Sequence, residues 1–150
     1  MNCDEFIEWL APAAQAQTRC YNLPASVLIA QGAIESGWGQ AVIGQYNLLG
    51  RKWNGAGPYI ELPTQEYEDG RYVTIWAKFQ DYPSLLHACD DWCILMTQES
   101  CYAPAVAALP DLAQFVRLMA TKYATNPNYS DDILRTIRAN NLTQYDELGI

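Results

Sequence analysis

Apolar residues recur three and four positions apart near both ends of the chain, which is the spacing of a helix with one buried face. Residues 4–18 show this spacing. The range opens with Asp4 and Glu5, whose negative charges suit the positive N-terminal end of a helix. Pro12 predicts a kink or a break in that helix, because proline lacks the backbone N–H that an inner turn needs. A second helix is predicted to begin near Pro24, which suits a first-turn position, and to end at Gly37.

Helix start signals predict further helices in the second half of the chain. Pro83 and Pro110 are expected to open the first two. Ser130 is expected to cap the third, because its hydroxyl can accept from a free backbone N–H and two aspartates follow it. These helices are predicted over residues 83–98, 110–124 and 130–140.

The middle of the chain follows a different pattern. Residues 39–57 hold five glycines and little helical or strand periodicity, and a connection this long in a compact domain is usually functional. Two β-rich runs follow, "YIELPTQEYE" and "RYVTIWAKF", separated by Asp69-Gly70, a pair typical of tight hairpin turns. The sequence therefore predicts one α+β domain over residues 1–150, mainly helical, with a small β-hairpin lobe at about residues 58–80.

The charge of the chain argues against whole classes of partner. The net charge is −8 with a pI near 4.4, and no basic cluster exceeds the pair Arg51 and Lys52. Nucleic-acid binding needs a basic surface that neutralises phosphates, so we expect none. The same argument counts against tight nonspecific adhesion to any anionic surface, including a bacterial wall.

The chain also lacks the patterns of membrane insertion and of secretion through a cleaved leader. No uncharged apolar run is long enough to span a bilayer, so we expect no membrane span. The opening "MNCDEFIEWL" is acidic where a secretory signal would place basic and then apolar residues. If the protein works outside the cytoplasm, we expect a holin, a secretion system or a longer parent chain to deliver it.

Five cysteines form no metal-binding signature. The stretch "HACDDWC" invites a zinc interpretation, but Cys89 and Cys93 lie four apart and no second pair follows. We interpret both as small apolar helix residues and His87 as structural, and we expect no metal and no cofactor. The odd count leaves at least one thiol unpaired within a monomer, and the pairing of the others stays open among Cys3, Cys20, Cys89, Cys93 and Cys101.

The stretch "AQGAIESGWGQ" places a single acid, Glu35, near the end of a predicted buried helix. The negative end of a helix dipole disfavours an anion, and burial disfavours the charged form of any carboxyl. A carboxyl held neutral beside an aromatic side chain is suited to act as a general acid. The alternative, equally open on these grounds, is a glutamate that points to solvent at a helix end.

Several linked motifs resemble one enzyme family. The stretch "LPASVLIAQGAIESGWG", followed by "YNLLGRKW", resembles the first motifs of glycoside hydrolase family 73. This is the mannosyl-glycoprotein endo-β-N-acetylglucosaminidase-like family, which includes flagellar peptidoglycan hydrolase and autolysin domains. The stretches "TQEYEDG", "FQDYPS" and "YATNPNY" follow in the family's order, so that the resemblance covers roughly residues 5–146. Gln80 stands where the family usually has Arg, and Asn126 where it usually has Asp. One hypothesis is that these two positions normally form or support an ion pair.

The resemblance implies a lysozyme-like α-lobe, a smaller β-lobe and a glycan cleft between them. It implies that Glu35 is the catalytic general acid and that Glu66 is a second, mobile carboxylate on the β-lobe. It also implies that Tyr123 lines the cleft near the acid and that Tyr129 closes the same motif. Glycoside hydrolysis needs an acid and a second group, which can be a base, a nucleophile or the 2-acetamido group of the substrate itself.

The aromatic side chains divide between sugar contact and packing. Trp53 lies in the glycine-rich loop and Tyr59 just after it. Contact with sugar and plain packing both stay open for these two residues. Asn47 is included among the substrate-contacting candidates, although fixing the loop backbone is the stronger interpretation. Trp38 is expected to pack against the helix end. The tryptophans within regular elements are predicted to be core residues: Trp9, Trp76 and Trp92.

These points lead to one expected function with alternatives. We expect a monomeric peptidoglycan hydrolase that cleaves the GlcNAc-β-1,4-MurNAc bond of glycan strands, in the periplasm or on the cell wall. The alternatives are a muramidase or lytic transglycosylase, which cut the other glycosidic bond, and a catalytically dead glycan-binding module. A delivered toxin would also imply an immunity protein that plugs the cleft.

Overall fold

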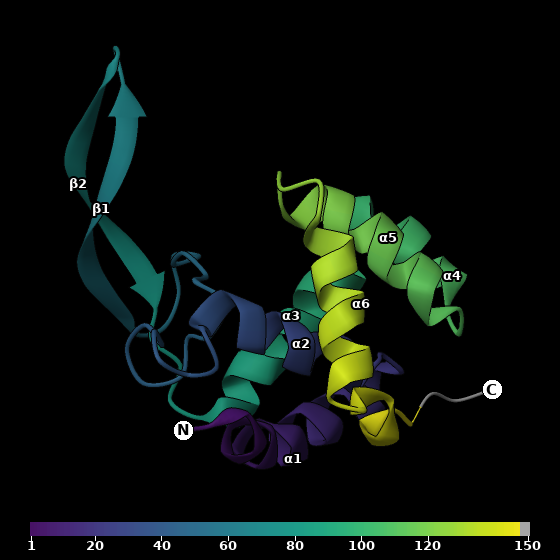
Figure 1. Ribbon diagram of the computed structural model, residues 1–150. Coiled ribbons are helices and arrows are strands. Elements are labelled where there is room, and N and C mark those ends of the chain that lie inside the picture. The colour runs from purple at the N-terminus through teal and green to yellow at the C-terminus, as the bar shows by residue number, and fades with distance from the viewer. Residues whose placement is uncertain (148–150) are drawn as a thin grey trace.

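The helices and the hairpin of the chain occupy separate parts of the molecule. The computed structural model describes residues 1–147, in which a β-hairpin stands beside a body of packed helices (Figure 1). The α-helices are α1 (Cys3–Tyr21), α2 (Ala25–Ser36), α3 (Leu85–Gln98), α4 (Ala103–Ala108), α5 (Leu112–Tyr123) and α6 (Tyr129–Ala139). The strands are β1 (Tyr59–Glu68) and β2 (Arg71–Gln80), and short 3-10 helices cover Ser100–Tyr102 and Leu142–Tyr145. The predicted α+β class with a separate hairpin lobe is confirmed.

Helix α1 continues through Pro12 without the predicted break. At its start, the Asn2 side chain accepts from the backbone N–H of Glu5 while the Glu5 carboxylate accepts from that of Asn2, a reciprocal capping box. Leu10 before the proline and Ala14 after it are both fully buried, and their burial holds the helix on both sides of the proline. Of the two predicted outcomes at Pro12, the break is therefore wrong and the kink stays a prediction.

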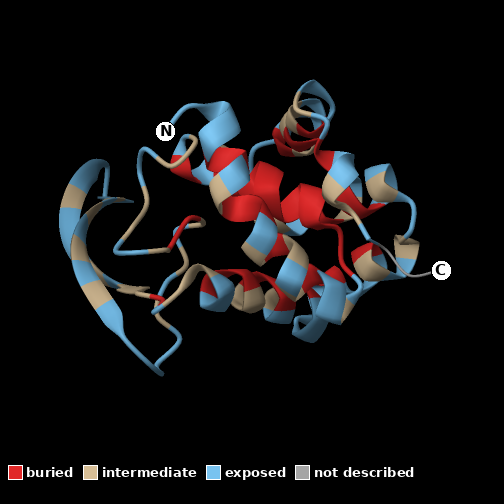
Figure 2. Ribbon diagram, turned by 90° about the horizontal axis from the view of Figure 1, so that it is seen from below, coloured by how far each residue is buried: buried red, intermediate tan, exposed pale blue. Residues whose placement is uncertain are grey.

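Helix α2 is the centre of the core. It is buried along nearly its whole length, and Figure 2 shows the buried residues gathered in the middle of the helical body. Gly32 lets α1 approach closely, since a Cβ there would lie 3.1 Å from Leu10 Cδ2. The helix ends at Gly37, whose left-handed backbone (φ 57°) suits glycine. The helix starts near Pro24 as predicted, but Pro24 is the residue before the helix rather than part of its first turn.

The remaining helices lie close to their predicted positions but begin differently. Ser84 and Asp111 cap α3 and α5 through their side chains, each one residue after the proline predicted to open the helix. Helix α6 begins at Tyr129 after Asn128, which makes no side-chain cap, and Ser130 lies inside the first turn. The prediction that Ser130 caps α6 is wrong, because the chain enters the helix two residues earlier. Helix α4 was not predicted.

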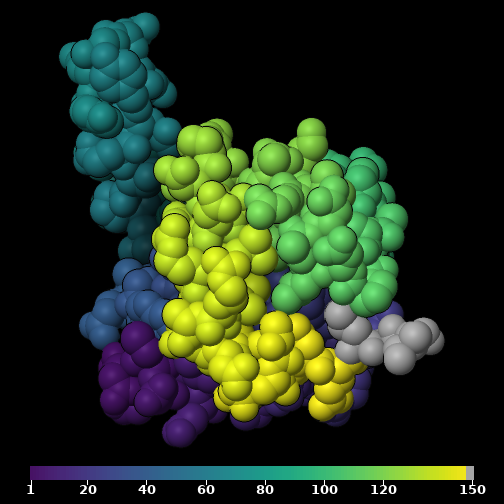
Figure 3. Space-filling model, turned by 45° about the vertical axis from the view of Figure 1, so that its right-hand side comes forward, coloured from purple at the N-terminus to yellow at the C-terminus, as the bar shows by residue number. Residues whose placement is uncertain are grey.

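The two strands form one antiparallel hairpin with Tyr59 opposite Gln80 and Glu68 opposite Arg71. The turn at Asp69-Gly70 has positive φ at both residues (50° and 81°), as tight hairpins require. The free end of the hairpin rises clear of the helical body (Figure 3). The predicted hairpin lobe is confirmed.

The predicted core aromatics differ in outcome. Trp92 is fully buried in α3, and Trp9 is half-buried against the core. Trp76 lies on the hairpin with 67% of its surface exposed, so its assignment to the core is wrong. A two-stranded sheet has no second layer here to cover both of its faces. Trp38 packs edge-on against Phe6 with ring centroids 5.7 Å apart, as predicted.

The cysteines of residues 1–147 are all free thiols. Cys89 and Cys93 are buried in α3, which confirms their interpretation as apolar helix residues. Burial raises the pKa of the Cys89 thiol to about 12. His87 is exposed, and its Nδ1 lies 2.6 Å from the Ser84 hydroxyl. Within the same residues, no helix combines the length and the apolar character needed to cross a membrane.

Candidate active site

Glu35 lies in the last turn of α2 with its side chain exposed. The Tyr129 hydroxyl donates a hydrogen bond of 2.9 Å to its Oε1. Of the two interpretations left open, the exposed glutamate at a helix end is the one observed, but its carboxyl is held by Tyr129 rather than free in solvent. The sequence places the acid at the C-terminal end of a buried helix, where the helix body fixes the backbone while the side chain reaches out of the core.

Tyr129 ties the acid to the interior of the helical body. It is only 4% exposed at the start of α6, and the Gln31 amide nitrogen donates to its hydroxyl oxygen over 3.1 Å. Trp92 Nε1 in turn donates to the Gln31 amide oxygen over 2.7 Å. Burial is the main cause that raises the pKa of Tyr129; the Gln31 bond lowers it and the charge of Glu35 raises it further. Residues from α2, α3 and α6 thus support one carboxyl oxygen.

Tyr123 stacks on Tyr129 with ring centroids 5.8 Å apart and planes 10° from parallel. It is half-buried at the end of α5. Burial, and then the nearby charge of Glu35, raise the pKa of its hydroxyl. Three of the predicted site residues, Glu35, Tyr123 and Tyr129, are therefore brought together. Tyr129, predicted as a substrate contact, is instead mostly buried behind the acid.

An open pocket of about 590 Å³ lies over this cluster. Its lining joins the end of α2, the glycine-rich loop and the α5 end of the helical body. The lining residues are Glu35, Leu49, Gly50, Arg51, Lys52, Leu95, Tyr102, Tyr123, Ala124 and Thr125. A pocket of this size and composition can hold a sugar chain beside a proton donor.

Arg51 and Lys52 line the pocket but were not predicted as site residues. Arg51 Nε lies 3.1 Å from Asp91 Oδ2 in α3, and the Tyr82 hydroxyl donates to the same carboxylate. This pairing holds the base of the Arg51 side chain while the residue still lines the pocket. The signal was present in the sequence, because these residues are its only adjacent cations and follow directly on the "NLLG" motif.

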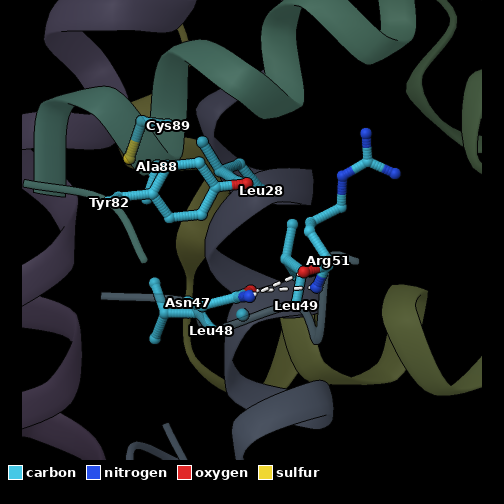
Figure 4. A pocket seen from close by; sticks show the side chains of 9 residues that line it. Leu28, Asn47, Leu48, Leu49, Arg51, Tyr82, Ala88 and Cys89 are labelled. Carbon is cyan, nitrogen blue, oxygen red and sulfur yellow. Dashed lines mark hydrogen bonds between the residues drawn. The ribbon is translucent and has the colours of Figure 1, made fainter. Parts of the chain in front are cut away.

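Asn47 belongs to the loop rather than to the substrate surface. Its side chain is bound to backbone groups: Nδ2 donates to the carbonyls of Arg51 (2.8 Å) and Gln80 (3.0 Å), and Oδ1 accepts from the N–H of Arg51. Figure 4 shows the Asn47 amide directed at Arg51, whose side chain extends away from it. The residue is 1% exposed, so the structure shows it fixing the loop backbone, and sugar contact stays a prediction. The cavity beside it holds only about 10 Å³, too little for a sugar ring.

Trp53 and Tyr59 pack on each other at the base of the hairpin. Their ring centroids are 4.8 Å apart, and the Lys78 ammonium lies 5.1 Å and 4.7 Å from the two rings. Trp53 Nε1 donates to the carbonyls of Ala56 and Gly57, which folds the glycine-rich loop around the indole. Packing is thus observed for both residues. They are not among the residues that line the pocket at Glu35, and sugar contact stays a prediction.

Glu66 lies on β1 opposite Val73, half-buried and close to the free end of the hairpin. It is not among the residues that line the pocket at Glu35. Figure 1 shows its strand rising on the side of the molecule, away from the helices that hold Glu35. The structure therefore does not bring the two predicted catalytic carboxylates together in one cluster, and the role of Glu66 stays a prediction.

The two positions that depart from the family pattern each have local partners. The Gln80 side chain accepts from the N–H of Asn54 over 2.8 Å, and Asn126 Oδ1 accepts from the N–H of Asn128 over 2.9 Å. Gln80 ends the hairpin, whereas Asn126 lies in the α5–α6 connection. This arrangement gives no support to the hypothesis that the two positions pair.

A helical lobe with an exposed glutamate at a helix end, beside a hairpin with a second glutamate, defines a lysozyme-like glycoside hydrolase domain. The chain belongs to the mannosyl-glycoprotein endo-β-N-acetylglucosaminidase family, whose model matches residues 11–142.

Relatives and a solved structure agree with this membership. The chain is 35% identical over 141 residues to the peptidoglycan hydrolase FlgJ of Escherichia coli K12, covering 89% of this chain and 45% of that protein. It is 34% identical over 152 residues to a probable N-acetylmuramidase of Lactococcus lactis, covering 95% of this chain and 35% of that protein. The catalytic domain of the autolysin Auto from Listeria monocytogenes superposes with a TM-score of 0.85 at 31% identity, covering 96% of this chain and 87% of that one. The chain thus spans less than half the length of these two curated relatives.

Proposed function

We propose that this chain hydrolyses the glycan strands of peptidoglycan at the GlcNAc-β-1,4-MurNAc bond, with Glu35 as the general acid. The observation that carries the proposal is an exposed carboxyl in an open pocket, held on one oxygen by a buried tyrosine. The names of the peptidoglycan hydrolase and the autolysin support the polymer, and the family's description supports the bond.

The chemistry begins with proton transfer. Glu35 gives its proton to the glycosidic oxygen while the bond from the sugar's C1 to that oxygen breaks and its electron pair goes to the oxygen. The leaving sugar departs as an alcohol, and C1 is left with oxocarbenium character. Water finally adds to C1 and loses one proton to a base, so that hydrolysis consumes one water for each bond cut.

The second group is assigned less directly. Glu66 can serve as base or nucleophile only if the hairpin brings it to the sugar, because it lies outside the pocket at Glu35. The acetamido carbonyl of the substrate can instead attack C1, with Glu66 orienting that group or the water. The anomer of the first product distinguishes the routes, since direct attack by water inverts C1 and an intermediate retains its configuration.

Muramidase activity is the second candidate, and the name of the Lactococcus relative supports it. Reducing-end analysis of digested peptidoglycan tests the choice. New reducing GlcNAc is expected; reducing MurNAc would indicate a muramidase, and anhydro-MurNAc a lytic transglycosylase. A protein that binds walls but leaves their turbidity unchanged would be a glycan-binding module.

The biological setting forms the last part of the proposal. We infer action in the periplasm or on the cell wall, after delivery by a holin, a secretion system or a longer parent chain. The domain acts as a monomer, because one chain carries the pocket and the acid. If it is a delivered toxin, an immunity protein would fill the pocket at Glu35. Co-purification with the product of a neighbouring gene tests this point.

A further inference from the structure

A chain of three hydrogen bonds runs from the core to the acid. Trp92 donates to Gln31, Gln31 donates to Tyr129, and Tyr129 donates to Oε1 of Glu35, over 2.7, 3.1 and 2.9 Å. Gln31 and Trp92 are fully buried and do not line the pocket. A substrate in the pocket therefore cannot touch them, and any effect they have on catalysis must pass through Tyr129.

The chemistry of the donors fixes the direction of this chain. An indole nitrogen can only donate, so the group of Gln31 that faces Trp92 must be its carbonyl oxygen. The Gln31 amide nitrogen then faces Tyr129, and since an amide nitrogen only donates, the tyrosine oxygen must accept. The single hydroxyl proton of Tyr129 is left for Glu35. None of these steps can be reversed without leaving a buried donor without an acceptor.

This direction distinguishes the two oxygens of Glu35. Oε1 accepts the hydrogen bond that the Tyr129 hydroxyl donates, and in a carboxylic acid the carbonyl oxygen is the better acceptor. The acid's own proton therefore belongs on Oε2, which has no hydrogen-bond partner within residues 1–147. Because the Glu35 side chain is exposed and lines the pocket, Oε2 is the oxygen available to a glycan.

We propose that Gln31 and Trp92 are positioning residues that direct the Tyr129 proton onto Oε1 of Glu35 and so keep the catalytic proton on Oε2. The inference rests on the proposed function, in which Glu35 protonates the glycosidic oxygen. In that step the proton moves from Oε2 to the leaving oxygen as the C1–O bond breaks, and Glu35 becomes a carboxylate that still accepts from Tyr129. Without Gln31, the Tyr129 oxygen can accept a hydrogen bond from the Glu35 carboxylic acid instead, which directs the acid's proton away from the substrate.

Two variants and one matched control test the proposal. Tyr129→Phe removes the donor to Glu35, and Gln31→Met removes the group that sets its direction while nearly keeping the side-chain volume. Tyr21→Phe is the control, because the Tyr21 hydroxyl also donates to a carboxylate, that of Asp90 (2.6 Å), but outside the pocket. Each protein is assayed on a soluble peptidoglycan oligosaccharide and on a dinitrophenyl β-glycoside, whose leaving group needs no protonation. Thermal unfolding is measured alongside.

On the oligosaccharide, Tyr129→Phe is expected to lower kcat about 10- to 100-fold, the range of one hydrogen bond to a charged group, with KM unchanged. Gln31→Met is expected to lower kcat about tenfold, because the Tyr129 hydroxyl remains but no longer has the Gln31 bond that makes it donate to Glu35. Tyr21→Phe should keep the parent kcat. On the dinitrophenyl glycoside, all three should act within about threefold of the parent, because general acid catalysis no longer contributes.

Equal losses on both substrates, or losses of kcat that follow the unfolding temperature in all three variants, would show a merely structural role and overturn the proposal. An unchanged kcat for Gln31→Met would also overturn it. Failure of the proposed function looks different, because the parent itself would then release no reducing ends from peptidoglycan.

Discussion

Replacing Glu35 by Gln should separate catalysis from stability. The amide keeps the shape of the side chain, and its oxygen can still accept from the Tyr129 hydroxyl that now binds Oε1. The change deletes the proton donor, so the loss in kcat should be at least about 10²–10⁴-fold, or roughly 3–5 kcal/mol of barrier.

The effect on folding is a difference of two small terms. Whenever Glu35 is ionised, its charge in the last turn of α2 opposes the helix dipole, and replacing it by an amide removes that opposition, which is worth about 0.3–1 kcal/mol. A hydrogen bond from Tyr129 to a neutral amide is worth about 1 kcal/mol less than one to a carboxylate. The two terms nearly cancel, so we expect a change within about 1 kcal/mol, or roughly 2–4 °C in Tm.

The assay combines clearing of purified cell walls with thermal unfolding of the same preparations. Glu35→Asp is a useful companion, because it keeps the acid but withdraws it from Tyr129 by one methylene. A Gln variant that clears walls at the parent rate would refute the assignment of Glu35. A Gln variant whose Tm is many degrees lower would refute the claim that the Glu35 carboxyl is exposed and held by a single hydrogen bond.

Further predictions concern the hairpin, the loop and the tyrosines. Glu66→Gln should reduce activity less than Glu35→Gln and leave clear residual hydrolysis; equal, complete loss with an inverted product would instead make Glu66 the obligatory base. Trp76→Ala should change the unfolding free energy by no more than about 0.5 kcal/mol, whereas Trp92→Ala should cost about 3–5 kcal/mol in urea titrations. Asn47→Ala should destabilise the fold by about 1–3 kcal/mol, because it leaves the half-buried N–H of Arg51 without its acceptor and removes a donor from the carbonyls of Arg51 and Gln80. Folding raises the pKa of Tyr123 and Tyr129 mainly by burial. Their contribution to the free energy of unfolding is therefore intact below about pH 10 and is lost above it, where the tyrosines of the unfolded chain ionise first. Tyr123→Phe should reduce the loss of stability with rising alkaline pH, as measured by denaturation curves.

Local signals in the sequence were enough for most of the fold. The Asp69-Gly70 turn fixes the register of the hairpin, since both residues adopt the positive φ that it requires. The sequence also placed Glu35 at the correct helix end. It failed at Pro12, where burial of the helix face keeps the helix continuous, and at Ser130, where the chain enters the helix two residues earlier.

The site was less predictable, because its parts come from distant segments. Gln31 and Trp92 lie 61 residues apart, and Gln31 and Tyr129 lie 98 apart, so no periodicity relates them. Burial was also left undecided for Glu35 and misjudged for Trp76. Both lie on elements whose composition is apolar, but one side chain leaves the core at a helix end and the other belongs to a sheet without a covering layer.

The charge of the molecule acts differently at long and at short range. The net charge of −8 argued against adhesion to an anionic wall. However, charges are screened beyond about 8 Å at physiological ionic strength, so the field within the pocket depends on the residues that line it. Arg51 and Lys52 lie there beside Glu35, and the partner of Arg51, Asp91, is held on the α3 side. The pocket that we propose for the glycan therefore carries two cations, one of them paired with Asp91, on a protein whose net charge is negative.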